Sequence, residues 1–115
     1  MLNVRHTKEN SVIKLHLDGR LDSLTAPVFE QQLEKLIKDG DYHVVIACDD
    51  LVFVSSAGLR VFLTFAKKIK KQSGNLALCG IQPSVYAVLE LSGFLSFLKL
   101  CPSADEAMAH VKPAQ

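Results

Sequence analysis

The sequence lacks a surplus of either charge. Its formal net charge is +1 over 115 residues, and acids and bases are mixed along the chain, so the basic footprint of a nucleic-acid-binding protein is missing. The one basic run, KKIKK at residues 67–71, falls late in a predicted helix, where cations are favourable. Uncharged apolar runs long enough to span a bilayer are also lacking, because the most apolar region, residues 85–101, contains Glu90 and Gly93. We therefore expect no nucleic-acid partner and no membrane span.

Cysteine is scarce, and its spacing excludes two common uses. Cys48, Cys79 and Cys101 are odd in number and show no C-x-x-C spacing. The first ten residues, MLNVRHTKEN, lack the apolar block of a signal peptide. These features predict a cytoplasmic protein whose cysteines stay reduced and behave as small apolar residues.

Glycine and histidine are also too few and too scattered to build a cofactor site. The 6 glycines never approach the G-x-G-x-x-G or G-x-x-x-x-G-K-[ST] spacing, so no glycine-rich loop is predicted to hold a nucleotide. The 4 histidines include no pair at H-x-x-x-H spacing, as a helical metal site would require. We expect neither a cofactor nor a metal ion.

A serine nucleophile is only half supported. Ser56 is followed two residues later by Gly58, but no glycine stands two residues before it, so the G-x-S-x-G elbow is incomplete. A catalytic triad would need His43, His16 or Asp22 to reach Ser56 through space. A hydrolase or transferase using Ser56 therefore remains an alternative, and the main expectation is that the protein is not an enzyme.

The hydrophobic pattern predicts two strands followed by alternating helices and strands. Apolar residues alternate over residues 11–19, as in a half-buried strand ending at Gly19, whereas residues 43–50 form a continuous apolar run typical of a central strand. Thr25 is the predicted cap of the first helix. This order predicts one α/β domain over residues 1–115, a sandwich with a mostly parallel mixed sheet of about four to five strands, about four helices and a frayed tail at 112–115. The expected strands are 2–7, 11–19, 43–50, 75–80 and 97–100, and the expected helices are 27–38, 56–73, 83–92 and 103–111.

The second predicted helix has a broad apolar stripe. On a helical wheel that starts at Ser56, Arg60 lies on the outside near the serine, and Val61 lies far enough round to join a part-exposed apolar patch. Such a patch would suit a docking surface for a partner. The inward face is expected to consist of Leu59, Phe62, Leu63 and Ala66.

Two adjacent serines stand where the strand pattern changes to the helical pattern. Ser55 or Ser56 is suited to cap the helix, because a serine hydroxyl accepts a hydrogen bond from a free N–H in the first turn. A helix N-terminus also favours an anionic phosphate, so an exposed hydroxyl there is suited to accept a phosphoryl group. Gly58 is expected to allow a close backbone approach at the helix start.

Two motifs together resemble a known family. The segment GRLDSLTAP, the later segment DDLVFVSSAGLRVFL and a downstream SGF are similar to the STAS domain, specifically to bacterial anti-sigma factor antagonists. The resemblance covers nearly the full chain. It implies a STAS-like sandwich and regulation by partner switching. An anti-sigma factor that is also a serine kinase phosphorylates the antagonist, and a metal-dependent serine phosphatase reverses the modification.

Carried over by position, the resemblance assigns roles to individual residues. Ser56 matches the phosphorylated serine, Gly58 matches the following glycine, and Asp22 matches an aspartate near the kinase contact. The surrounding contact surface would also include Ser55, Arg60 and Val61. The chain departs from many antagonists by having Ser55 where they have aspartate, which lets Ser55 compete as a site. A constitutive STAS adaptor of a transporter or sensory complex, never phosphorylated, is the alternative within the family.

Overall fold

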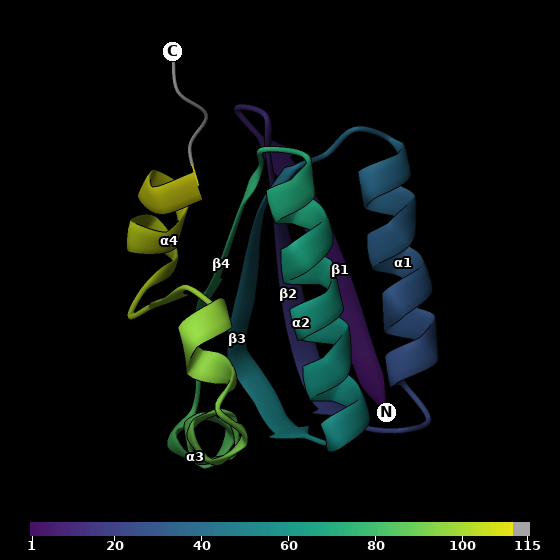
Figure 1. The fold of residues 1–115 in the computed structure, drawn as a ribbon, viewed down its shortest axis with the longest axis vertical. Coiled ribbons are helices and arrows are strands. Elements are labelled where there is room, and N and C mark those ends of the chain that lie inside the picture. The colour runs from purple at the N-terminus through teal and green to yellow at the C-terminus, as the bar shows by residue number, and fades with distance from the viewer. Residues whose placement is uncertain (112–115) are drawn as a thin grey trace.

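The computed structural model describes residues 1–111, and the tail predicted to fray, 112–115, lies outside the described residues. Five strands form one sheet in the order β1-β2-β3-β4-β5, with β1 antiparallel to β2 and the other pairs parallel (Figure 1). This confirms the expected α/β class. The elements are β1 (Leu2–Glu9), β2 (Val12–Leu21), α1 (Ala26–Lys38), β3 (His43–Val54), α2 (Ser56–Lys71), β4 (Asn75–Cys79), α3 (Pro83–Ser92), the 3-10 helix η1 (Phe94–Phe97), β5 (Leu100–Cys101) and α4 (Ala104–Val111).

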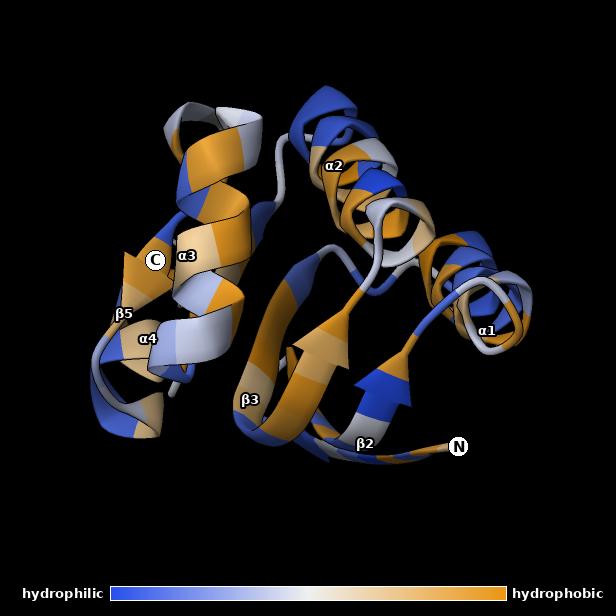
Figure 2. Ribbon diagram, turned by 90° about the horizontal axis from the view of Figure 1, so that it is seen from below, coloured by the Kyte–Doolittle hydropathy of each residue, from blue (hydrophilic) through white to orange (hydrophobic). Residues whose placement is uncertain are grey.

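The helices lie on both faces of the sheet. Helices α1, α2 and α3 pack on one face, where they share a large apolar core with β2 and β3 (Figures 1 and 2). Helix α4 covers β3 and β4 on the opposite face with a smaller core. The cysteines are buried in these cores and unpaired, as expected of small apolar residues. Within residues 1–111, no helix combines the length and apolarity that crossing a bilayer requires.

Several predicted boundaries were wrong at strand ends. Strand β2 does not end at Gly19 but continues to Leu21 through a register shift between Gly19 and Arg20. The backbone of Gly19 has φ +121°, a conformation that glycine adopts without strain, so the chain bends there without leaving the sheet. Near the C-terminus, residues 94–97 form η1 after the left-handed Gly93, and the last strand is limited to Leu100–Cys101.

The long β3 strand places the start of α2 against the end of β2. Strand β3 runs to Val54 because its second half pairs with the extension of β2. The backbone N–H of Ser55 then donates to the carbonyl of Leu21 at 2.9 Å. Gly58 packs against the same residue, since a Cβ there would lie 2.7 Å from Leu21 Cγ and 2.9 Å from its carbonyl oxygen. The close approach expected of Gly58 is confirmed, and its neighbour is Leu21.

This contact predicts the sign of a mutational effect. Helix propensity alone would make Gly58→Ala stabilising by about 0.5–1 kcal/mol. Because the added methyl would overlap Leu21, we expect instead a loss of about 1–3 kcal/mol in the free energy of unfolding, the range for overpacked sites. Urea unfolding of the two proteins measures this difference. A variant as stable as wild type, or more so, would show that the contact can relax without cost.

Candidate functional site

The structure assigns different positions to the two serines. Ser55 is the N-cap of α2, with extended backbone angles of φ −88° and ψ 174°, and its Oγ accepts a hydrogen bond from the Gly58 N–H at 3.3 Å. The helix itself begins at Ser56. Capping was expected of one serine of the pair, and Ser55 is the residue that does it.

Ser56 is left exposed at the first position of the helix. Among residues 1–111, its hydroxyl takes part in no hydrogen bond, because the cap interaction is supplied by Ser55. The first turn of α2 contains no acidic residue that would repel an anion. Unpaired N–H groups and the positive end of the helix dipole make such a position favourable for a phosphate.

Asp22 lies in a tight turn that leads from β2 into α1. Its Oδ1 accepts hydrogen bonds from the backbone N–H groups of Leu24 at 3.0 Å and Thr25 at 3.1 Å. The N–H of Thr25 is the largest cause that holds the pKa of the Asp22 carboxyl below its ordinary value, so the side chain is an anion at neutral pH. Because Asp22 follows Leu21 directly, the turn lies beside the start of α2.

Thr25 is the N-cap residue of α1, as predicted, but its side chain makes no capping hydrogen bond to the helix. Its hydroxyl instead accepts from the Asp22 N–H at 2.9 Å and lies 2.9 Å from the Arg20 carbonyl, to which it donates. Thr25 therefore fixes the turn that presents Asp22, and Pro27 lies in the first turn of the helix, where its missing N–H costs no hydrogen bond.

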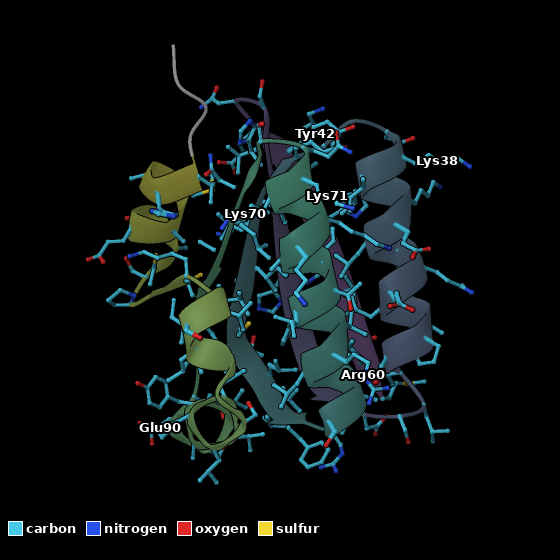
Figure 3. All side chains as sticks on the ribbon, viewed as in Figure 1. Lys38, Tyr42, Arg60, Lys70, Lys71 and Glu90 are labelled. Atoms are coloured by element: carbon cyan, nitrogen blue, oxygen red, sulfur yellow. The ribbon has the colours of Figure 1, made fainter. Side chains whose placement is uncertain are left out.

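Exposed apolar side chains and a cation lie at the same end of the molecule as Ser56. Val52 is 51% exposed, Phe53 is 38% exposed and Leu24 is 84% exposed. The Arg20 guanidinium lies 4.1 Å from the centre of the Phe53 ring. Figure 2 views this end, where the last part of β3 is coloured as hydrophobic, and Figure 3 shows Arg60 near the start of α2. A partner that docks here would meet an apolar surface with fixed charges around it.

The expected exposure of Val61 is contradicted. Its side chain is only 6% exposed, because α1 packs against this side of α2. Phe65 is buried on the same side, and Phe29 of α1 meets Phe62 of α2 edge to face, with ring centres 6.1 Å apart. A wheel of one helix could not include the neighbouring helix. At this end of the molecule, exposed apolar side chains include instead Leu24, Val52 and Phe53, which the sequence pattern did not single out.

The four histidines do not lie near Ser56. His16 donates from Nε2 to Asp50 Oδ2 at 2.9 Å, and its Nδ1 accepts from the Arg5 guanidinium at 3.1 Å. It precedes Leu21 by five strand residues, a distance of about 16 Å. His43 starts β3 at the opposite end, and His6 pairs with Leu15. His110 lies on α4, which covers the other face of the sheet. The structure thus places none of these histidines beside Ser56, where a triad built on that serine would require one.

The fold, together with the adjoining segments around Asp22 and around Ser55 and Ser56, is typical of one protein family. The family model of the STAS domain matches residues 3–107, and the chain belongs to this family. Among named relatives, BtrV of Bordetella bronchiseptica, whose name assigns it as an anti-sigma factor antagonist, is 39% identical over 98 residues, which cover 85% of this chain and 84% of that protein. The resemblance to the STAS family is thereby confirmed.

Solved structures show the same fold at low sequence identity. An anti-sigma factor antagonist from Mycobacterium paratuberculosis has a TM-score of 0.89 at 22% identity, covering 98% of this chain and 96% of that chain. The Bacillus cell fate determinant SpoIIAA in its phosphorylated form has a TM-score of 0.72 at 17% identity, covering 95% of this chain and 97% of that chain. These similarities show that the chain has the same fold as those proteins.

The different roles of Ser55 as the helix cap and Ser56 as an exposed residue can be tested by replacing each serine with alanine. We expect Ser55→Ala to lower the free energy of unfolding by about 1 kcal/mol, because it removes the cap of α2. Ser56→Ala is expected to change it by less than about 0.5 kcal/mol, as is usual for exposed positions. Guanidinium unfolding of both variants measures the contrast. Equal losses at the two positions would contradict the assignment of the cap to Ser55.

Proposed function

We propose that this protein is an anti-sigma factor antagonist controlled by phosphorylation of Ser56. Without phosphate it binds an anti-sigma factor that is also a serine kinase, and the sigma factor is freed. Phosphorylation releases the antagonist, and a metal-dependent serine phosphatase restores it. The protein acts as a binding module rather than an enzyme, in the cytoplasm, where the kinase finds its nucleoside triphosphate.

One observation carries the proposal. Ser56 presents a hydroxyl that no described residue engages, at the exposed start of a helix, while Ser55 performs the structural role. The site can therefore gain a phosphate without losing the cap that holds α2. The names of the relatives support the class of function, and SpoIIAA, which shares the fold, is known in a phosphorylated form.

The chemistry of the transfer belongs to the kinase. The Ser56 Oγ would attack the terminal phosphorus of a nucleoside triphosphate, the bond to the bridging oxygen would break, and the nucleoside diphosphate would leave. The hydroxyl proton would pass to a base of the kinase. The product carries about −1.5 to −2 charges at neutral pH. Ser56 lies at the same end of the molecule as exposed Val52, Phe53 and Leu24. A partner that covers this end would have to desolvate the phosphate charge, which would favour release.

Ser55 is a poorer acceptor than Ser56 for a structural reason. Its side chain is half-buried, and its oxygen accepts the Gly58 N–H. Modification of Ser55 would replace this hydrogen bond with a bulky dianion beneath the first turn. The absence of an aspartate before Ser56 thus leaves a capping hydroxyl at that position, and Ser56 remains the accessible one.

The direct test is the mass of the protein from its own cells. Intact mass and fragment mapping across several growth conditions are expected to locate one phosphate at Ser56 and none at Ser55. Phosphate at Ser55 alone would contradict the assignment of the site. An unmodified mass in every condition, together with Ser56→Ala that behaves like wild type, would favour the constitutive adaptor.

A second test concerns Arg60, which is exposed one turn after Ser56. We expect Arg60→Glu to weaken binding of the anti-sigma kinase at least tenfold, because reversal of a charge beside the docking surface turns attraction into repulsion. Titration calorimetry with the purified kinase measures the affinity. Lys67→Glu, an equal charge change on the exposed surface farther along α2, is the matched control and should alter the affinity little. Equal affinity for wild type and Arg60→Glu would remove Arg60 from the contact surface.

A further inference from the structure

We infer that Arg60 binds the phosphate on Ser56 within the same chain, so that its guanidinium changes partner when the serine is modified. This inference rests on the proposed function for the presence of the phosphate. Phosphorylation would then weaken kinase binding in two ways. The phosphate adds negative charge to the docking surface, and it also pairs with Arg60, which in the unmodified protein is free to contact the kinase.

The spacing on α2 places the two side chains together. Ser56 and Arg60 are four residues apart on a helix that runs from Ser56 to Lys71, and both are exposed. Side chains at this spacing are neighbours, with Cβ atoms about 5–6 Å apart. A guanidinium presents a planar fork of N–H donors that matches two phosphate oxygens, which an arginine one turn away can reach.

Arg60 is available for this role. The ion pairs among residues 1–111 join Lys8 to Asp41, His16 to Asp50 and Lys68 to Glu34, and none includes Arg60. Figure 3 shows its side chain near the amino-terminal end of α2.

A second cation near the site, the Arg20 guanidinium, already contacts an aromatic ring. Arg20 of β2 lies over the Phe53 ring, with 4.1 Å between guanidinium carbon and ring centre. Its move to the phosphate would require loss of that cation–π contact, whereas Arg60 loses nothing comparable. The geometry therefore favours Arg60 over Arg20.

The remaining charges near the site act in opposite directions. Asp22, in the adjoining turn, is held as an anion by backbone N–H groups and would repel the phosphate dianion. The amino group of Met1 acts on the same carboxyl as a favourable charge, and Arg20 adds a further cation on the β2 side. Against this mixed background, Arg60 is the cation that lies one turn from the serine on the same helix.

The titration of the phosphate itself tests the pair. Phosphoserine can be installed at position 56 during synthesis by an expanded genetic code, and its 31P chemical shift followed against pH. An adjacent cation stabilises the dianion, so Arg60 lowers a second phosphate pKa that is ordinarily about 6. We expect Arg60→Gln to raise this pKa by about 0.3 units, the size given by a helical pair at this spacing. The matched control Lys67→Gln removes the same charge farther along α2 and should leave the pKa unchanged.

Three outcomes would overturn the inference and one further result would strengthen it. An unchanged phosphate pKa in Arg60→Gln would show that no pair forms. Equal rises of the phosphate pKa in Arg60→Gln and Lys67→Gln would show that the phosphate responds to the net charge of the helix and not to contact with Arg60. A rise confined to Arg20→Gln would make Arg20 the partner. Restoration of the low pKa by Arg60→Lys, with the difference reduced in 1 M salt, would support an ion pair.

The experiment separates this inference from the proposed function. The phosphate is placed chemically, so the titration gives its answer whether or not any kinase modifies Ser56 in the cell. If native protein carries no phosphate but the phosphate pKa rises in Arg60→Gln, the proposed function is rejected and the Arg60–phosphate pair is kept. Native phosphate at Ser56 with no change in pKa would keep the function and reject the pair.

Discussion

The contact between the end of β2 and the start of α2 is the interaction on which the site depends. The Leu21 carbonyl accepts the Ser55 N–H, and Gly58 lies against the Leu21 side chain and backbone. These two interactions join segments that are more than thirty residues apart in the chain. They fix where the helix begins and bring the Asp22 turn beside it. Without this close approach, the segment around Asp22 and the segment around Ser55 and Ser56 would be separate loops at one edge of a sheet.

The sequence was a good guide to the architecture and a weaker guide to the surface. Regular alternation and apolar runs predicted the order of elements, because periodicity reports which face of an element is buried. The pattern could not show that β2 passes through Gly19 in a bend, since a glycine marks a turn and a bulge equally well. Nor could it show that the strand expected at 97–100 would begin only at Leu100, after the 3-10 helix that ends at Phe97.

At the candidate site, the sequence pointed to the serine pair but could not show how the two serines divide their roles. Ser55 and Ser56 have the same side chain, and only the backbone angles of the helix start decide which hydroxyl faces the free N–H groups. Val61 was expected near the surface because one helix was considered alone, whereas α1 buries it. The exposed Val52 and Phe53 escaped notice because they follow two aspartates, where a strand was expected to have ended.

The cap at Ser55 has a consequence for the lifetime of the protein in the cell. Proteolysis of a folded chain follows the population of its unfolded form, which the free energy of unfolding sets. A phosphate at Ser56 would leave the Ser55–Gly58 hydrogen bond in place, and because a helix N-terminus favours an anion, it would not enlarge this population. Modified chains would then be degraded no faster than unmodified ones. The duration of a signal would depend on the enzymes that add and remove the group, and the same pool of molecules could serve many cycles.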